Sequence, residues 1–361
     1  MSVTTTTAPT AEPPVDPTGT PARPPARRVL DALADLWRKN ASVLPTVAAV
    51  AIFVAMIVYG ETAYGRIVQY STLSNLLINN AHLIVIAIGL TMVIISGRGG
   101  IDLSVGAVIA FSSVMGVLLA NAGWNPWLVM LLMVAVGGLF GLGSGVLIQY
   151  FDVQPFIATL AMMFLARGLA STLSTVPERL DDDSPIRDVG QVIKIIDGPK
   201  VNDLMVTPGV LLAVVVVLVA FFVMHRTRLG RTIYAMGGSR TSAALMGLPV
   251  KRTILTIYTV SGTLSGLAAV IYTSRLGIAQ NITGLGWELD AIAATVIGGT
   301  LLTGGAGFVL GSVVGALVLG LMNVLITRDG GIRPETTTII TGGILLVFVL
   351  LQRSVTARRR E

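Results

Sequence analysis

Apolar residues dominate the chain in long runs that are separated by short polar or basic stretches. A membrane-spanning helix needs roughly 20 mostly apolar residues, and ten segments approach that length. They are residues 43–59, 76–96, 103–120, 126–148, 155–176, 208–225, 253–273, 289–302, 305–327 and 336–352. The pattern predicts an all-α polytopic membrane protein with about ten transmembrane helices. Counts of eight or nine stay open, because the eighth run is short enough to be re-entrant.

Composition agrees with this class of protein. Hydrophobic residues make up 53% of the 361 residues and charged residues only 12%, against about 25% in soluble domains. The chain has no cysteine and two histidines, which excludes disulfides and thiolate sites and makes a histidine metal cluster untenable, so no metal is expected. The net charge of +6 resides in loops and tails beside apolar runs, which is typical of membrane orientation rather than of a nucleic-acid partner.

The distribution of charge predicts the topology. The basic N-terminal region, the basic loop 226–252 and the basic C-terminus should be cytoplasmic, whereas loop 177–207 is acidic on balance and should be extracytoplasmic. Residues 1–28 are rich in Thr, Pro and Ala, and residues 1–40 are predicted to form a disordered basic tail. A transmembrane domain over 41–353 and a basic tail at 354–361 follow. The many later spans favour a retained first helix over a cleaved signal peptide.

The stretch 96–106 interrupts an otherwise apolar region with the sequence S-G-R-G-G-I-D-L-S-V-G. A helix broken at membrane depth requires surrounding protein or a water-filled cavity, and an ionisable residue there, Asp102, indicates function. The alternative is a short cytoplasmic turn. Loop charges place the break on the cytoplasmic side, which favours a gate or hinge turn with Asp102 as a helix N-cap.

A similar sequence recurs later in the chain. Residues 99–109 and 304–314 match at a fixed offset, and both lie between apolar segments. Transporters are commonly built from repeats whose Gly-interrupted segments mark the pathway. Coincidence in a chain with 40 glycines is the alternative. The predicted hinge or packing residues are Gly99, Gly100, Gly106, Gly304, Gly305 and Gly311.

Other glycines recur every fourth residue, as in Gly137, Gly141 and Gly145, and in Gly262 and Gly266. This spacing places them on one helix face, where they allow two backbones to approach closely. Packing within the chain is the favoured interpretation, and a dimer interface or moving interface is the alternative.

The basic loop contains a short helix signal. Ser239 can cap a helix from Arg240 to Met246, and Gly247 can end it. Leu245 and Met246 would give this helix an apolar tip suited to docking in a groove. A solvated basic loop is the alternative interpretation.

Polar residues occur within or beside several apolar runs. Amides, carboxylates and an aromatic ring suit a sugar pathway, although interfacial capping would account for any one of them. Asn79 and His82 lie three residues apart and can share a helix face. The residues predicted for the pathway or gate are Asn79, His82, Asp102, Ser104, Arg167, Glu288 and Asp290.

Four ordered motifs carry a family resemblance over residues 75–352. They are G-L-T-M-V-I-I-S-G-R-G-G-I-D-L-S-V-G, T-L-A-M-M-F-L-A-R-G, R-T-R-L-G-R-T-I-Y-A-M-G-G and G-W-E-L-D-A-I-A-A-T-V-I-G-G-T-L-L-T-G-G-A-G. With these motifs the chain resembles the permease subunit of bacterial ATP-binding-cassette importers for monosaccharides of the ribose, xylose and galactose type. Residues 226–248 look nearer the galactofuranose permease than the ribose permease.

This resemblance implies a pore-forming subunit of the bacterial inner membrane that pairs with a second permease, either another copy or a paralogue. An ATPase subunit would bind ATP and Mg, and an extracytoplasmic binding protein would deliver a pentose or hexose, furanoses included. The chain itself would bind no cofactor and catalyse nothing; it has no G-x-x-x-x-G-K-[ST] phosphate loop. The implied coupling residues are Ser239, Arg240, Leu245, Met246 and Gly247.

Two departures from the family pattern stand out. Arg98 and Gly99 lengthen the usual S-G-G-I-D-L-S turn, and Arg240-Thr241-Ser242 replaces the Glu-Ala-Ala of ribose-type loops. The second departure suggests a dedicated ATPase and disfavours ribose as the substrate. An ion-driven secondary transporter and a permease for branched-chain amino acids remain alternative functions, whereas an intramembrane enzyme lacks a catalytic set.

Overall fold

Long apolar helices account for most of the protein. Its computed structural model describes residues 44–191, 193–198, 201–330 and 336–357. The tail predicted at 1–40 lies outside the described residues, as does the tail at 354–361 except for residues 354–357, which continue the last helix. The chain divides into two units, Met1–Leu44 and Pro45–Glu361, and the arrangement below is that of the second.

Each of the ten predicted apolar runs overlaps a helix, and two further short helices lie in the basic loop. The helices are α2 (Leu44–Tyr64), α3 (Tyr70–Ile95), α4 (Val105–Asn121), α5 (Pro126–Tyr150), α6 (Pro155–Leu173), α7 (Pro208–Arg226), α8 (Arg228–Gly238), α9 (Arg240–Leu245), α10 (Val250–Leu276), α11 (Trp287–Ile297), α12 (Val309–Asp329) and α13 (Thr336–Ala357). Proline opens α5, α6 and α7, where its missing N–H costs no helical hydrogen bond.

Seven of the described helices are long and apolar enough to cross a membrane, namely α2, α3, α5, α6, α7, α10 and α12. The shorter α4 is also apolar, and α11 has only 11 residues. The protein is therefore a polytopic α-helical membrane protein, as the hydrophobic pattern predicts. Helix α11, in the short eighth run, is too short to cross a bilayer by itself.

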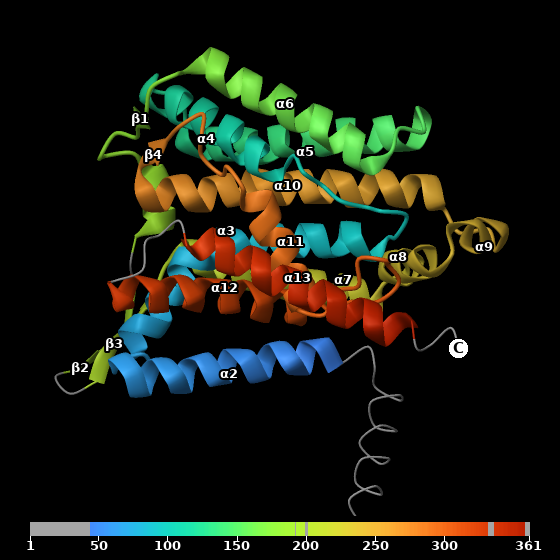
Figure 1. The fold of residues 1–361 in the computed structure, drawn as a ribbon. Helices are drawn as coiled ribbons and strands as arrows, with labels where there is room; N and C mark the ends of the chain where they lie inside the picture. Colours follow the sequence, from blue (N-terminus) through green and yellow to red (C-terminus); the bar gives the residue numbers. More distant parts are fainter. Residues whose placement is uncertain (1–43, 192, 199–200, 331–335, 358–361) are drawn as a thin grey trace, which may run out of the picture. The chain divides into compact units, whose positions relative to one another are not determined.

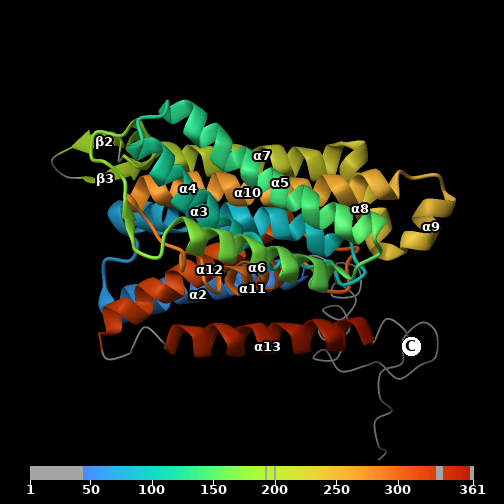
Figure 2. The same cartoon turned by 90° about the horizontal axis from the view of Figure 1, so that it is seen from above.

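Helix α10 lies at the centre of the bundle, between α5 on one side and α3 on the other (Figure 1). Beyond α5, the helices α4 and α6 pack on each other, and beyond α3 the helix α12 packs against both α3 and α11. Figure 2, seen from above, shows the long helices running side by side in the same general direction. Helix α3 is the most enclosed span, since nearly all side chains of its second half are buried.

The four-residue glycine spacing brings α5 and α10 together. A Cβ atom on Gly137 or Gly141 would collide with the backbone of α10 at Gly262 and Tyr258, and a Cβ atom on Gly262 would collide in turn with α5. Gly266 contacts the backbone of α5 in the same way. These glycines therefore pack within one chain, as the favoured interpretation predicts, and they let two long helices approach at backbone distance.

The ends of α3, α5, α7, α10 and α12 define two faces of the bundle. At one face the loop after α6 carries β1 (Glu178–Arg179), η1 (Pro185–Gly190) and a hairpin of β2 (Ile193–Gly198) and β3 (Val201–Val206). Strand β1 pairs antiparallel with β4 (Ile278–Ala279), directly after α10. This face holds the acidic loop and is the one that the positive-inside rule assigns to the extracytoplasmic side.

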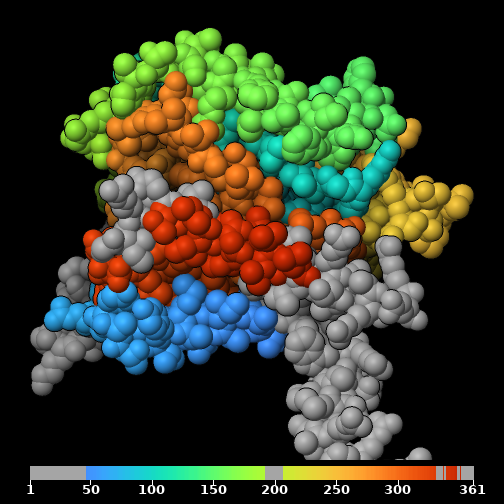
Figure 3. Space-filling model, in the orientation of Figure 1, coloured from blue at the N-terminus to red at the C-terminus, as the bar shows by residue number. Residues whose placement is uncertain are grey.

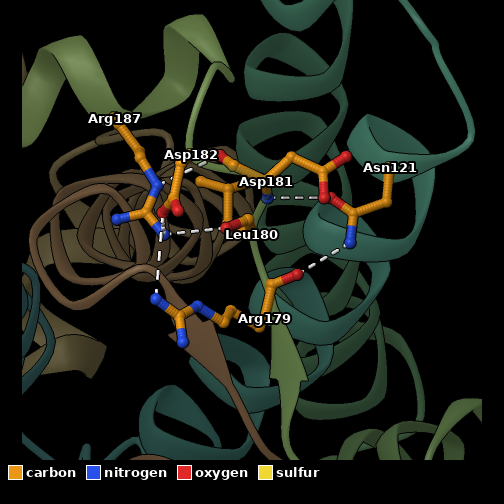
Figure 4. Close-up of polar contacts among 6 residues, drawn as sticks. All are labelled: Asn121, Arg179, Leu180, Asp181, Asp182 and Arg187. Carbon is orange, nitrogen blue, oxygen red and sulfur yellow. Dashed lines mark hydrogen bonds and ion pairs between the residues drawn. The ribbon is translucent and has the colours of Figure 1, made fainter.

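Side-chain hydrogen bonds connect the acidic loop to the end of α4 (Figure 4). Asn121 Nδ2 donates to the Arg179 carbonyl at 2.7 Å, and Asn121 Oδ1 accepts from the Asp181 N–H at 3.3 Å. Arg187 pairs with Asp182 at 2.9 Å and donates to the Leu180 carbonyl at 2.8 Å. The extracytoplasmic end of α4 is thus held firmly by the loop.

The opposite face gathers the turns after α3 and α11 with the basic helices α8 and α9. The Gly305 N–H donates to the Ile95 carbonyl at 2.9 Å, and Gly304 packs on Gly97 without room for a Cβ atom. Tyr234 on α8 donates to the Gly307 carbonyl at 2.8 Å. The two sequence-related glycine turns therefore meet each other on the face assigned to the cytoplasm, where α9 projects at the edge of the bundle (Figure 3, yellow).

Two crossings are part non-helical chain and part helix. After the turn at Gly97, which lies against Gly237, residues 99–104 run without helix into the bundle, and α4 completes the crossing. After α10, residues 280–286 return into the bundle from the other face, and α11 continues to the cytoplasmic face. The two crossings meet where Gly106 packs on the Gly284 backbone. Both half-helices therefore begin inside the protein, close to one another.

The contact between α5 and α10 gives a stability prediction. Gly141→Ala should lower the free energy of unfolding by about 1–3 kcal/mol, because the new methyl group overlaps the Tyr258 carbonyl and forces the helices apart. Gly168→Ala on α6 is the matched control, since nothing lies within 4 Å of its Cβ position. Thermal unfolding in detergent measures both variants, and equal unfolding temperatures would contradict the close packing.

Candidate functional site

A cavity of about 480 Å³ lies between α3, α11 and α12 and reaches the extracytoplasmic ends of α3 and α12. Asn79 and His82 contribute to its wall from one face of α3, as their spacing predicts, and Asp290 contributes from the first turn of α11. The polar or aromatic lining residues are Asn79, Asn80, His82, Trp287, Asp290, Asn323, Thr327 and Arg328. The cavity is large enough for a small polar solute.

Aromatic rings form one end of this cavity. The ring centroids of His82 and Trp287 lie 4.4 Å apart, and Tyr272 on α10 packs against Trp287 at 4.7 Å with an edge-to-face geometry. Such packing fixes the indole plane. A flat apolar face beside amides and a carboxylate suits a molecule that presents C–H groups on one side and hydroxyl groups around its rim.

Glu288 lies apart from this cavity. Its Oε2 atom faces the start of α4 so closely that a Cβ atom on Gly106 would contact it, and it interacts electrostatically with Arg167. Within the described residues this oxygen is buried without a hydrogen-bond partner. Glu288 thus belongs to the junction of the two half-helices, whereas Asp290 faces the cavity.

Arg167 contacts the turns that precede α11 in the second broken crossing. Its Nη1 atom donates to the Asn281 and Thr283 carbonyls, each at 2.6 Å. Carbonyl groups freed from a helix need such partners inside a membrane protein. Arg167 therefore holds the chain that leads into α11, and the structure does not place it in the cavity lined by Asn79 and His82.

Asp102 lies in the non-helical part of the first broken crossing, and it is fully buried. Its Oδ1 atom accepts from the Ser104 N–H at 3.0 Å and from the Ser104 hydroxyl at 2.6 Å, while Oδ2 accepts from the Ser261 hydroxyl at 2.7 Å. Ser261 lies near the middle of α10. The carboxylate thus joins the extended chain to the central helix.

Two details of the sequence interpretation need correction here. The N-cap position of α4 is Ser104 and not Asp102, since the helix begins at Val105 and the carboxylate binds the backbone ahead of it. Only the turn at Gly97–Gly99 lies at the cytoplasmic face, because Asp102 reaches the middle of α10. The break therefore extends from that face deep into the bundle.

The predicted hinge glycines have different surroundings. Gly106, Gly304, Gly305 and Gly311 each pack against another backbone, with Gly311 on the Gly298 carbonyl. Gly100 is enclosed by its own turn, and Gly99 has nothing within 4 Å of its Cβ position but a φ of +66°. The structure therefore shows close packing at most of these glycines and a left-handed turn at Gly99, where glycine costs least.

The family is decided by comparison with known proteins. Residues 72–349 match the family described as branched-chain amino acid transport system / permease component. The chain belongs to this family. No solved structure matches it.

Individual relatives of this permease include sugar transporters. It is 51% identical over 322 residues to the fructose import permease protein FruG of Bifidobacterium longum, covering 89% of this chain and 94% of the relative. It is 39% identical to the inner membrane ABC transporter permease protein YjfF of Escherichia coli, over 87% of this chain and 93% of the relative. The ribose import permease protein RbsC of Bacillus subtilis is 36% identical over 75% and 81% of the two chains.

Helix α9 of this permease forms as its sequence predicts. The Ser239 hydroxyl accepts from the Ser242 N–H at 3.2 Å, and Gly247 adopts a φ of +77° after the helix. The side chains of Leu245 and Met246 are 85% and 68% exposed, so this permease presents an apolar tip at that face.

Sequence reasoning missed several residues of the site. Ser261 and Tyr272 sit in an apolar run with no local signal, because their roles depend on partners far away in the chain. Asn323 interrupts the apolar run of α12, and that isolated amide was the available signal for its place in the cavity wall.

The bonds of Asp102 give a prediction for this permease. Asp102→Ala should lower the free energy of unfolding by about 3 kcal/mol or more, because it leaves the Ser104 N–H and the Ser261 hydroxyl buried without an acceptor. Asp102→Asn should lose less, and Asp183→Ala in the exposed loop should change little. Thermal unfolding checks all three. An Asp102→Ala protein of normal stability whose transport no longer depends on pH would instead make Asp102 a proton carrier.

Proposed function

We propose that this permease is the membrane-spanning subunit of an ATP-binding-cassette importer that moves a hexose of the fructose class into the cytoplasm. The cavity between α3, α11 and α12 is the observation that carries the proposal, since it combines the Trp287 ring, the Asn79 amide and the Asp290 carboxylate. The sugar specificity of FruG, at 51% identity, supports fructose over ribose.

The complex proposed around the chain follows from its family. Two permease chains, identical or paralogous, would enclose the pathway, and an extracytoplasmic binding protein would deliver sugar to the cavity. The ATPase subunits would hold ATP and Mg, because this sequence has no phosphate-binding loop. The chain would bind no cofactor and catalyse no reaction itself. Its place is the bacterial inner membrane, which it crosses many times.

We assign the coupling of ATP hydrolysis to transport to α9 and the residues beside it. Ser239 and Gly247 delimit the helix, and Arg240 is its first residue. An ATPase cleft would receive Leu245 and Met246, the most exposed apolar pair in this region. From there α8 leads directly to the glycine turns, through the contact of Gly237 with Gly305. Movement of α9 would therefore reach both turns, which act as the hinges of alternating access.

The alternatives predict different chemistry. An ion-coupled transporter needs titratable groups free to exchange protons or ions, whereas Asp102 and Arg167 are committed to internal hydrogen bonds. Uptake that survives ATP depletion but stops with an uncoupler would establish that rival. Inhibition of uptake by leucine and not by fructose would indicate a branched-chain amino acid permease.

Asp290 tests the sugar pathway. Asp290→Asn should lower kcat/KM for sugar uptake into proteoliposomes about tenfold or more, because a charged acceptor for hydroxyl groups is lost. Asp183→Asn, in the exposed acidic loop, is the control and should transport normally. Normal fructose uptake by Asp290→Asn in the assembled importer would remove Asp290 from the pathway.

Met246 tests the coupling assignment. Met246→Asp should abolish sugar-stimulated ATP hydrolysis in the reconstituted complex, because a carboxylate would have to enter an apolar cleft. Met246→Leu preserves the apolar tip and should leave coupling intact. The Met246→Asp variant should also keep the unfolding temperature of the wild type, since the Met246 side chain is exposed. Unchanged stimulation with Met246→Asp would show that α9 is not the docking element.

A further inference from the structure

Two adjoining cavities open on the cytoplasmic face, beside the extra arginine of the glycine turn. Their volumes are about 450 and 650 Å³, and they share Arg98, Ile148, Asp152 and Arg240 as lining residues. Three elements meet there, namely the turn after α3, the loop between α5 and α6, and the start of α9. Neither cavity belongs to the sugar pathway described above, which lies on the other side of the central helices.

Positive charge is in excess in this pocket. Arg98 pairs with Asp152 at 3.7 Å, and Lys251 adds a further cation to the wall. Arg240 donates to the Gln149 side chain at 3.0 Å. Burial, followed by the like charge of Arg98, lowers the pKa of Arg240. The walls of the two cavities thus carry one carboxylate and three cations, and the like charge of the two guanidinium groups favours binding of another anion.

The backbone holds this arrangement at a cost. Arg98 has a φ of +54° and Asp152 a φ of +50°, and neither is glycine. Residues with side chains rarely adopt this left-handed conformation, and such strain gathers at binding sites. The two residues belong to separate turns, and their side chains, 63% and 82% exposed, form the ion pair at 3.7 Å.

The surroundings of the pocket favour a lipid as the source of the anion. Phe156, the second residue of the membrane helix α6, lines one cavity and is 51% exposed. Phe151 and Ile157 beside it are also exposed. An acyl chain can lie along these side chains while its headgroup reaches the arginines, since basic pockets beside cytoplasmic helix ends suit anionic headgroups.

We propose that the pocket lined by Arg98, Arg240 and Asp152 binds the phosphate of an anionic phospholipid from the cytoplasmic leaflet. The two guanidinium groups are the phosphate donors, and Asp152 is the internal anion with which the lipid competes. This site goes beyond sugar import, and it gives a role to the arginine that lengthens the glycine turn.

The test uses the full-length permease purified in detergent. Native mass spectrometry with phosphatidylglycerol and phosphatidylcholine compares the two lipids at equal concentration. The wild-type chain should prefer phosphatidylglycerol. Arg98→Gln and Arg240→Gln should each lower its affinity about fivefold, the ratio that corresponds to the roughly 1 kcal/mol expected per arginine at a lipid surface. Arg252→Gln, an exposed arginine of α10 outside both cavities, is the control and should bind as the wild type does.

Asp152→Asn is the decisive variant, because the proposal predicts that it changes lipid affinity in the opposite direction from the arginine variants. It removes the competing carboxylate, so affinity for phosphatidylglycerol should rise, an outcome that misfolding does not produce. Equal binding of both lipids, or equal effects of Arg98→Gln and Arg252→Gln, would overturn the proposal. Displacement of the lipid by millimolar inorganic phosphate would assign the pocket to free phosphate. Loss of ATPase binding in Arg98→Gln with unchanged lipid binding would assign it to the partner protein.

Discussion

Backbone groups inside a bilayer have no water to bind, and this constraint explains where the polar residues of the permease lie. Two crossings are non-helical for part of their length. The first is held by the buried Asp102 and the second by the half-buried Arg167. Asp102 accepts hydrogen bonds along the first, and Arg167 donates to the carbonyls of the second. The two meet at Gly106 and Gly284, where any larger residue would separate them. Asp102 and Arg167 therefore support the non-helical parts of these crossings.

This arrangement places polar and aromatic side chains of the cavity wall at the start of a half-helix. Because α11 begins inside the bundle, Trp287 and Asp290 in its first turn face the cavity that opens at the extracytoplasmic end. The other end of α11 leads to the turn at Gly304–Gly305, which contacts both the turn after α3 and the end of α8. In the proposed mechanism, a displacement of α9 by the ATPase reaches the sugar cavity through these contacts.

Local patterns predicted most helices well, because most apolar runs are long and several boundaries carry a proline, a glycine or a capping residue. Ser239 and Gly247 delimit α9 for that reason. The roles of Asp102 and Arg167 could not be predicted, since Ser261 lies 159 positions from Asp102 and the partners of Arg167 are backbone carbonyls. The pairing of Arg98 with Asp152 could not be predicted from local sequence either, because Asp152 belongs to a different turn. Asn79, His82 and Asp290 do line one cavity, and their part in a sugar pathway stays a prediction.

The absence of cysteine allows a direct test of the broken crossings. Spin labels at Ala122→Cys, beyond the end of α4, and at Leu285→Cys, beside Gly284, report the depth of the second crossing by double electron–electron resonance. Leu285 is 73% exposed and tolerates a label. The length of α4 predicts a separation of about 22 Å, at 1.5 Å per residue from Gly106 to Asn121. A much shorter distance would place residue 285 in an ordinary loop at the extracytoplasmic surface and contradict the account.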